Sequence, residues 1–120
     1  MMNTNTEATL QKKLEKFEGS RHFLKPQMSL SLLATLLKTN GKYLSYIINT
    51  HREKDFNNYI NELRINYILA KLEEDKMYRK YKISILAKEC GFSSAGKFAT
   101  IFKKMTLHSP SDFIESINNN

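Results

Sequence analysis

The sequence predicts an all-α fold of about seven helices, in which two helix-turn-helix subdomains are joined by a long linker helix. Three observations support this prediction. No segment shows the alternation of apolar and polar residues that is typical of strands. Two segments, 30–49 and 83–103, share one pattern: a short apolar helix, a tight turn and a second, amphipathic helix. Between them lies a longer run of apolar residues at helical spacing.

The two copies align through their apolar residues, which a helix-turn-helix buries on the inner faces of its two helices. The matched positions are Leu30, Leu33, Ala34, Leu44, Ile47 and Ile48 in the first copy, and Ile83, Leu86, Ala87, Phe98, Ile101 and Phe102 in the second. The alignment requires one extra residue in the second turn. We therefore expect two subdomains of the same design that differ in turn geometry.

The start of the chain contains residues that typically end or begin helices. Apolar residues recur at helical spacing over 7–18, and Gly19 is suited to the end of that helix. Because a proline disfavours helix in the residue before it, Pro26 predicts a loop over 20–28. Ser29 then caps the first helix of the first copy.

The turn of the first copy is expected over 38–41 and its second helix over about 42–50. Asp55 can cap the linker helix, which we expect to end near residue 75. Twenty residues at about 1.5 Å each give this helix a length of roughly 30 Å. Its apolar residues are expected to form a single stripe: Phe56, Tyr59, Ile60, Leu63, Tyr67, Ile68 and Leu72.

The end of the chain contains a basic connector and a last helix. The connector, residues 76–82, carries two tyrosines, and a solvated loop and a phosphate contact explain it equally well. Pro110 follows Ser109 and suits the first helical position, where its missing N–H removes no hydrogen bond. Phe113 and Ile117 are expected to pack this helix inward.

The predicted organisation follows from these elements. It comprises a disordered tail over 1–6, a double helix-turn-helix domain over 7–117 (first unit about 29–50, linker helix about 55–75, second unit about 82–104) and a disordered tail over 118–120.

The composition favours an anionic partner. The formal net charge is +7 and the pI is about 9.5, and nucleic acid is the commonest partner of so basic a domain. Cys90 is the only cysteine, so an internal disulfide is excluded, and its apolar surroundings predict a buried thiol. No run reaches the roughly 20 apolar residues of a membrane span, and the first residues lack the apolar core of a signal peptide. We expect a cytoplasmic protein that makes no membrane contact.

An enzyme is a poor alternative. His22, His51 and His108 do not have the spacing of metal ligands, and scattered surface histidines explain them better. A glycine-rich phosphate loop is absent from the sequence, and no histidine lies at a suggestive interval from the serines. We expect no metal, no cofactor and no enzymatic activity.

The second copy and its flanks resemble a known family, the AraC/XylS-type bacterial transcription regulators, in their C-terminal DNA-binding domain. The linker resembles that family's linker helix from Phe56 through 59–65. The resemblance covers about residues 7–117, including the one-residue difference between the turns. The positions that carry it in the second copy are Ile83, Ile85, Leu86, Ala87, Gly91, Phe92, Ser93, Ser94, Phe98, Phe102, Lys103, Lys104, Ser109, Pro110 and Phe113.

The resemblance implies a seven-helix, two-lobed domain that docks into successive major grooves of DNA and catalyses no reaction. The family often has glycine at the end of each recognition helix, where this chain has Glu53 and Leu107. Since glycine relieves the strain of a left-handed cap, we expect these two helices to end in another way. The family usually has arginine after the final aromatic residue, where Ile114 stands here.

The outward faces of the two recognition helices supply the candidates for base contact. Lysine can donate to guanine, asparagine can pair with adenine, and serine, threonine or tyrosine can contact base edges, methyl groups or phosphates. The candidates are Lys42, Tyr43, Ser45, Tyr46 and Asn49 in the first unit, and Lys97 and Thr100 in the second. Half-burial of the Tyr43 ring against the core is an equally good structural role for that residue. Because the second unit has small residues at 95, 96 and 99, we expect the first unit to discriminate bases more strongly.

Phosphate contacts are expected at helix N-termini, where free N–H groups and the positive end of the helix dipole attract anions, and from lysines at the groove edge. The candidates are Ser29, Ser31, Lys82, Ser84, Ser94, Lys103 and Lys104. Arg64 on the linker helix is assigned a structural role, as the ion-pair partner of Glu62 or another acid, in preference to a DNA contact.

Sequence-specific binding to double-stranded DNA is the function that these observations favour. A helical protein-interaction module without specific DNA binding is the main alternative. The lysines discriminate between the two, because Lys42, Lys97, Lys103 and Lys104 all fall on the predicted recognition helices. We also expect a monomeric segment of a longer regulator, with RNA polymerase or a missing sensor domain as further partners.

Overall fold

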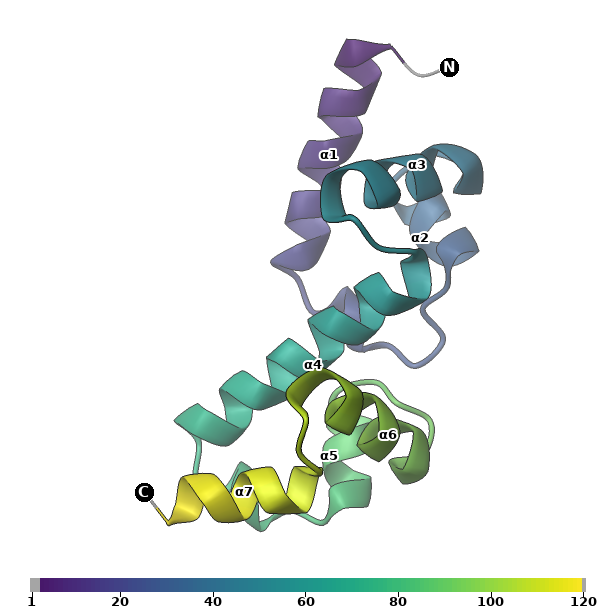
Figure 1. The fold of residues 1–120 in the computed structure, drawn as a ribbon. Helices are drawn as coiled ribbons and strands as arrows, with labels where there is room; N and C mark the ends of the chain where they lie inside the picture. The colour runs from purple at the N-terminus through teal and green to yellow at the C-terminus, as the bar shows by residue number, and fades with distance from the viewer. Residues whose placement is uncertain (1–2, 120) are drawn as a thin grey trace. The chain divides into compact units, whose positions relative to one another are not determined.

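The computed structural model describes residues 3–119, which contain seven α-helices, two short 3-10 helices and no strand (Figure 1). The all-α prediction is confirmed. The elements are α1 Thr4–Glu18, η1 His22–Leu24, α2 Leu30–Leu36, α3 Gly41–Arg52, α4 Phe56–Glu74, η2 Tyr78–Lys80, α5 Ile83–Glu89, α6 Ala95–Thr106 and α7 Pro110–Asn118. Within the described residues, no helix has the length and apolar character needed to cross a membrane.

The chain forms two compact units, residues 1–60 and 61–120, whose boundary falls inside α4. The first unit contains α1, η1, α2, α3 and the first turn of α4. The second contains the rest of α4 followed by η2, α5, α6 and α7. Each unit therefore has the same order of elements: a long helix, a 3-10 turn, a helix-turn-helix and the start of a further helix. The internal repeat is longer than its apolar pattern alone predicts.

The helices of the two helix-turn-helix motifs match in length, and their turns share one conformational feature. α2 and α5 have 7 residues each, and α3 and α6 have 12 each. Both turns contain one residue with positive φ at the same place, Lys38 at 57° and Gly91 at 90°. The residue after it donates its backbone N–H to a carbonyl five residues earlier, at 2.9 Å in each turn. Since the second turn has one residue more before its helix begins, the predicted difference is confirmed.

Six α-helices begin with a side chain that satisfies a free backbone N–H, and this explains most helix starts. The capping residues are Asn3, Ser29, Asn40, Asp55, Ser94 and Ser109. The predicted caps at Ser29 and Asp55 are confirmed, as is Pro110 in the first turn of α7. The prediction of disorder over 1–6 is wrong from Thr4 onward, because Asn3 caps α1. The predicted tail over 118–120 likewise gives way to helix at Asn118; residues 1, 2 and 120 lie outside the described part.

The core of the first unit lies between α1, α2 and α3. Leu14, Leu33, Leu44, Ile47 and Ile48 are fully buried. The sequence pattern placed the last three on the inner face of the recognition helix, and this is confirmed. Burial of each such side chain contributes about 1.5–3 kcal/mol, so this small core accounts for much of the unit's stability.

A polar cluster ties three helices of the first unit together. Glu18, at the end of α1, accepts hydrogen bonds from Arg52 Nε at 2.7 Å and Nη2 at 3.0 Å. It also accepts from the Tyr59 hydroxyl at 2.6 Å. The hydrogen bond that Arg52 donates to Glu18 raises the pKa of Arg52, and burial together with the same carboxylate raises the pKa of Tyr59. Nearby, His51 Nε2 lies 2.8 Å from Glu7 Oε1, so this histidine is half-buried and paired, against the surface position expected.

Aromatic rings form the centre of the second unit. Ring centroids lie 5.6 Å apart at each of three successive steps, in the favourable tilted or edge-to-face geometry. The series runs Phe92, Phe98, Phe102 and Phe113. It links the turn, α6 and α7, so the inward packing of Phe113 is confirmed. Cys90 is fully buried among these elements, as predicted.

Helix α4 differs from the single apolar stripe that its sequence predicts. Ile65 and Arg64 are buried as well, and neither belongs to the expected stripe. The physical reason is that the helix serves both units in turn. Tyr59 packs against Phe17 in the first unit, whereas Arg64 lies 5.6 Å from the ring centre of Phe92 in the second.

The ends of both recognition helices also differ from expectation. Glu53 and Leu107 adopt the left-handed conformation, with φ of 57° and 69°. Glycine is therefore replaced by residues that accept the same strained geometry, and the prediction of a different helix end is wrong. At α6 the cap is closed by the Leu107 N–H, which donates to the Lys103 carbonyl at 2.8 Å. We attribute the conformation to the short links that must connect these helices to α4 and α7.

Candidate nucleic-acid interface

The outward face of α3 carries the predicted base-contacting residues of the first unit. Lys42, Tyr46 and Asn49 are exposed, with Tyr46 49% exposed. Tyr43 and Ser45 are half-buried, which for Tyr43 agrees with a ring that partly covers the core. All five lie on a helix whose opposite face is fixed by buried Leu and Ile residues. This face is therefore rigidly presented.

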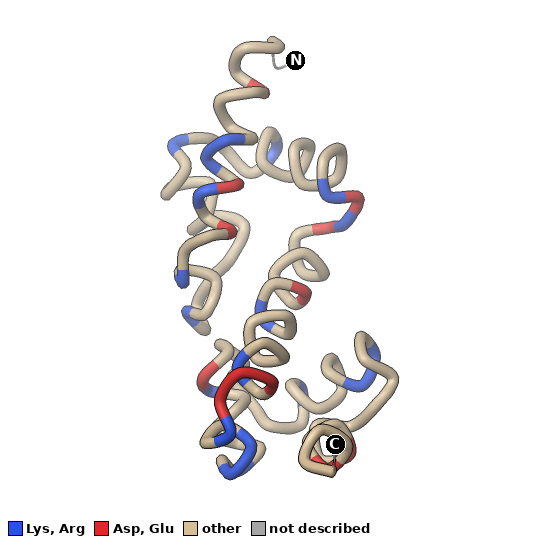
Figure 2. The backbone as a smooth tube through the Cα atoms, turned by 90° about the vertical axis from the view of Figure 1, so that its left-hand side faces the viewer, with Lys and Arg blue, Asp and Glu red and all other residues tan. Residues whose placement is uncertain are grey.

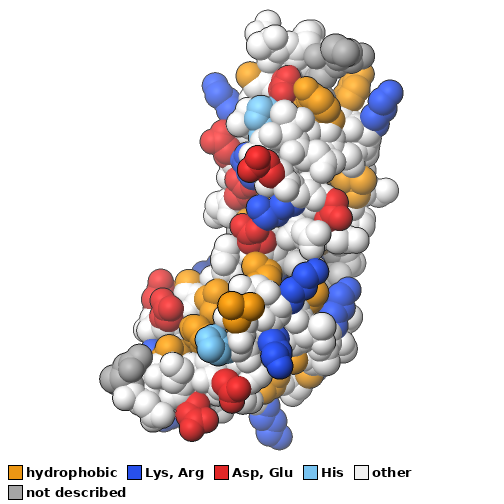
Figure 3. Space-filling model, viewed as in Figure 1, with side chains coloured by type: hydrophobic (Ala, Val, Ile, Leu, Met, Phe, Trp, Pro, Cys, Tyr) orange, Lys and Arg blue, Asp and Glu red, His pale blue; other side chains and the backbone are white. Residues whose placement is uncertain are grey.

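The outward face of α6 carries the corresponding residues of the second unit. Lys97, Thr100, Lys103 and Lys104 are all exposed. In Figure 3, basic side chains project from the surface over this helix. Gly96 has nothing within 4 Å of where a Cβ would stand, so the start of this face is open.

Two of the predicted base-contacting side chains are engaged with their own helix. Asn49 Nδ2 donates to the Ser45 carbonyl at 2.9 Å, and Thr100 Oγ1 donates to the Gly96 carbonyl at 3.0 Å. Each keeps polar capacity toward solvent: Asn49 has its carbonyl oxygen and a second N–H, and Thr100 has its lone pairs. A base contact by Asn49 through both ends of its amide requires the side chain to release the backbone.

Five of the predicted phosphate-contacting residues lie at exposed helix starts, and Lys103 and Lys104 lie in the last turn of α6. Ser29 and Ser94 use Oγ to accept the capping hydrogen bonds of α2 and α6. Each hydroxyl hydrogen remains available to donate to a phosphate oxygen. Lys82 begins α5 without a side-chain cap, and both Ser31 and Ser84 are exposed in the first turns of α2 and α5.

The charges of both recognition helices favour an anionic partner. Neither α3 nor α6 contains an acidic residue. Within the described residues, no carboxylate forms a salt bridge with Lys42, Lys97, Lys103 or Lys104. Acidic residues concentrate elsewhere, as at the end of α4 (Figure 2, red), where the chain switches directly to a basic segment (blue). Four unneutralised ammonium groups on two exposed helix faces make these faces attractive to anions.

The basic connector is more ordered than a simple loop. Arg79 donates to the carbonyls of Leu72 at 2.6 Å and Glu73 at 3.1 Å, so it caps the end of α4. The Tyr78 hydroxyl donates to Glu89 at 3.0 Å, and burial and this contact raise the pKa of Tyr78 to about 12. Two of the connector's side chains therefore have structural roles.

The structural role assigned to Arg64 is confirmed. Its side chain is buried and stacks on Phe92, and burial lowers the pKa of the guanidinium. The predicted ion pair with Glu62 or another acid stays a prediction.

The element-by-element match between the units adds one candidate for DNA contact that the apolar pattern of the sequence did not single out. Thr50 is exposed on α3 at the place that Lys104 occupies on α6. Aligning the two recognition helices from end to end, in addition to their apolar residues, would have identified it.

Within residues 3–119, no group of His, Cys, Asp and Glu side chains is arranged to hold a metal ion. The arrangement that the structure does provide is two exposed, basic helices, each the second helix of a helix-turn-helix. This is the general class of a double helix-turn-helix protein.

Comparisons with known proteins identify the family. A family model described as "Helix-turn-helix domain" matches residues 33–116, most of the chain. No match is found among the curated proteins.

Several solved structures share the fold. The C-terminal domain of AraT, a response regulator from Geobacillus stearothermophilus, has a TM-score of 0.76 at 20% identity, with 90% of this chain and 84% of that chain covered. A transcriptional regulator with an AraC-type DNA-binding domain from Chromobacterium violaceum has a TM-score of 0.73 at 17% identity, covering 96% of each chain. The DNA-binding domain of AdpA, a global transcriptional factor in complex with a target DNA, has a TM-score of 0.77 at 15% identity, covering 92% and 93%.

The chain belongs to the AraC-type helix-turn-helix family, whose members are DNA-binding transcription regulators. The family predicted from the second helix-turn-helix and its flanks is thus confirmed.

Proposed function

We propose that this chain binds double-stranded DNA sequence-specifically, by placing α3 and α6 in successive major grooves, and thereby regulates transcription. The observation that carries the proposal is the pairing of two matched helix-turn-helix motifs whose second helices expose hydrogen-bonding and cationic side chains and no acid. The crystal structure of the AdpA domain, which shares this fold, is that of a complex with a target DNA. This supports the proposal.

The proposed roles of the side chains follow from their chemistry. Lys42, Tyr46 and Asn49 contact base edges from α3, and Lys97 and Thr100 do so from α6. The other base-contacting candidates, Tyr43 and Ser45, are half-buried and act at the margin of the face. Because α6 has alanine or glycine where α3 has polar side chains, the first unit contributes more of the base discrimination.

The phosphate contacts supply affinity. Lys103 and Lys104 lie at the C-terminal half of α6, and Lys82 and the serines of the helix starts lie at α2, α5 and α6. Each lysine that neutralises a phosphate releases counterions, so it steepens the salt dependence without adding sequence information. Contact with RNA polymerase or a sensor domain, and a monomeric state, stay predictions.

A titration of matched variants tests these roles. We expect Lys103→Ala and Lys104→Ala each to weaken binding to all duplexes alike and to reduce the slope of log affinity against log salt by about 0.9. Lys97→Ala should instead weaken binding mainly to duplexes with the preferred base under α6. Lys12→Ala, an exposed lysine on α1, serves as the charge control. If Lys12→Ala weakened DNA binding as much as the substitutions of the α6 lysines, this would contradict the proposal.

A further inference from the structure

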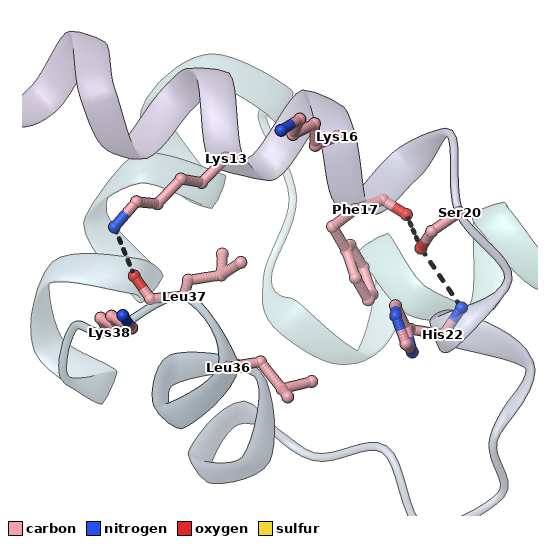
Figure 4. Close-up of a pocket in the computed structure, with 8 residues that line it drawn as sticks. All are labelled: Lys13, Lys16, Phe17, Ser20, His22, Leu36, Leu37 and Lys38. Carbon is pink, nitrogen blue, oxygen red and sulfur yellow. Dashed lines mark hydrogen bonds between the residues drawn. The ribbon is translucent and has the colours of Figure 1, made fainter.

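The first unit has an open groove between α1 and α2 that the DNA-binding faces do not use. Its volume is about 580 Å³, and its walls come from the second half of α1, the turn after it and the end of α2 (Figure 4). The residues that line it are Lys13, Lys16, Phe17, Ser20, His22, Leu36, Leu37 and Lys38. None of them is acidic.

The groove has an apolar floor. Leu36, the last residue of α2, is 48% exposed, whereas Leu33 and Ala34 of the same helix are buried. Figure 4 shows Leu36 and Phe17 facing the space between the two helices. Single exposed leucines on a convex surface are common, whereas an exposed leucine inside a groove indicates an interaction surface.

The rim of the groove is cationic. Lys16 and Lys38 are exposed, and Lys13 keeps two N–H donors after donating one to the Leu37 carbonyl at 3.1 Å. Figure 4 places Lys13 and Lys38 at one end and His22 at the other, with Lys16 above the floor. Cations distributed along an apolar strip match an occupant with several carboxylates around an apolar stripe. A small molecule with one carboxylate would use only one of them.

The second unit bridges the equivalent place with its own side chains. By the match of the two repeats, Leu36 corresponds to Glu89 and His22 corresponds to Tyr78. These two residues are joined by a hydrogen bond of 3.0 Å between the Tyr78 hydroxyl and the Glu89 carboxylate. In the first unit, Leu36 has no polar group with which His22 could form such a hydrogen bond. The hydrogen bond across the equivalent place in the second unit therefore has no counterpart between His22 and Leu36 of the first unit, which line the open groove.

From charge complementarity and the exposed floor, we infer that this groove docks an acidic, amphipathic segment of a partner protein, with Leu or Phe side chains against Leu36 and carboxylates against Lys16 and Lys38. Peptide recognition by a groove that accepts the apolar face of a helix is a recurrent mode of protein interaction. The segment binds without DNA, so this inference is independent of the proposed function.

The test uses a labelled peptide of about 15 residues, with Leu and Phe on one helical face and Glu on the other, and a scrambled peptide of the same composition. Binding to the full chain is followed by fluorescence anisotropy. Leu36→Gln removes the floor and Lys16→Glu inverts the rim; both residues are exposed, so the fold is retained. The controls are Leu107→Gln, which alters an exposed leucine outside the groove, and Lys12→Glu, which makes the same charge change elsewhere on α1.

We expect saturable binding of the patterned peptide, weakened at least about fivefold by each groove variant and less than about twofold by each control. Equal binding of the scrambled peptide, or equal effects of Lys12→Glu and Lys16→Glu, would show that net charge alone attracts the peptide and would overturn the inference. If Lys16→Glu and Leu36→Gln leave peptide binding unchanged and weaken DNA binding instead, the groove contacts the duplex, and the inference is equally wrong.

Discussion

Replacement of Leu107 by glycine should stabilise the protein, although it removes a large apolar side chain. Leu107 ends α6 in the left-handed conformation, with φ of 69°, and is 80% exposed. A left-handed residue other than glycine costs about 1–2 kcal/mol. Since most of the leucine surface is in water in the folded state, its removal loses little hydrophobic burial.

The net gain is smaller than the relieved strain. Glycine adds about 0.5–1 kcal/mol of conformational freedom to the unfolded chain, which opposes the gain. We therefore expect Leu107→Gly to raise the free energy of unfolding by about 0.5–1 kcal/mol, which corresponds to roughly 2–5 °C in Tm for a domain of this size. Thermal unfolding followed by circular dichroism measures both quantities.

The matched control is Leu107→Ala, which removes the same side chain but keeps the Cβ that makes the conformation costly. It should show no gain. If alanine stabilises the protein as much as glycine does, the strain is not the cause. If the Leu107→Gly variant is less stable than the Leu107→Ala variant, the helix end does not hold residue 107 in the left-handed region.

The remaining predictions concern packing, capping and reactivity. Gly91→Ala should lower the free energy of unfolding by about 1–2 kcal/mol, because φ is 90° at this residue. Gly96→Ala should raise the free energy of unfolding by about 0.5–1 kcal/mol, because this residue lies in a helix with open space around it. Chemical denaturation measures both changes. Glu18→Gln weakens the hydrogen bonds from Arg52 and Tyr59 and should cost about 1–3 kcal/mol, measured in the same assay against the exposed control Glu15→Gln. Burial raises the pKa of the Cys90 thiol to about 12, so at neutral pH it should react with an alkylating reagent only as fast as the second unit opens.

The helix-turn-helix repeat could be predicted from sequence because it depends on local patterns. Apolar residues at helical spacing and capping side chains such as Ser29 and Asp55 act within one turn of the chain, so their effect is visible in a short window. The exposure of Lys42 and Lys97 follows from the same pattern, since residues opposite a buried stripe face water.

Features that depend on contacts between distant residues could not be predicted. The bridge from Glu18 to Arg52 and Tyr59 spans up to 41 residues of sequence, and no local pattern announces it. The left-handed conformation of Leu107 is likewise imposed by its surroundings, because its own preference opposes it.

The groove illustrates the same limit. In sequence, Leu36 belongs to an apolar helix but lies outside the aligned inner-face residues, so the pattern does not show what surrounds it. Only the position of α1 shows that it stays half-exposed beside lysines from another helix. The comparison with Glu89 became possible once the two units could be matched element by element.

Sequence-specific DNA binding by α3 and α6 is tested by selecting bound duplexes from a randomised pool with the full chain. Anisotropy titrations of the selected sequence at several salt concentrations follow. We expect a motif of two blocks about ten base pairs apart, with Lys42→Ala relaxing one block and Lys97→Ala relaxing the other. Tight binding with a steep salt dependence but no motif would show that the lysines bind phosphate without base recognition. Absence of binding at low salt would contradict the DNA-binding account itself.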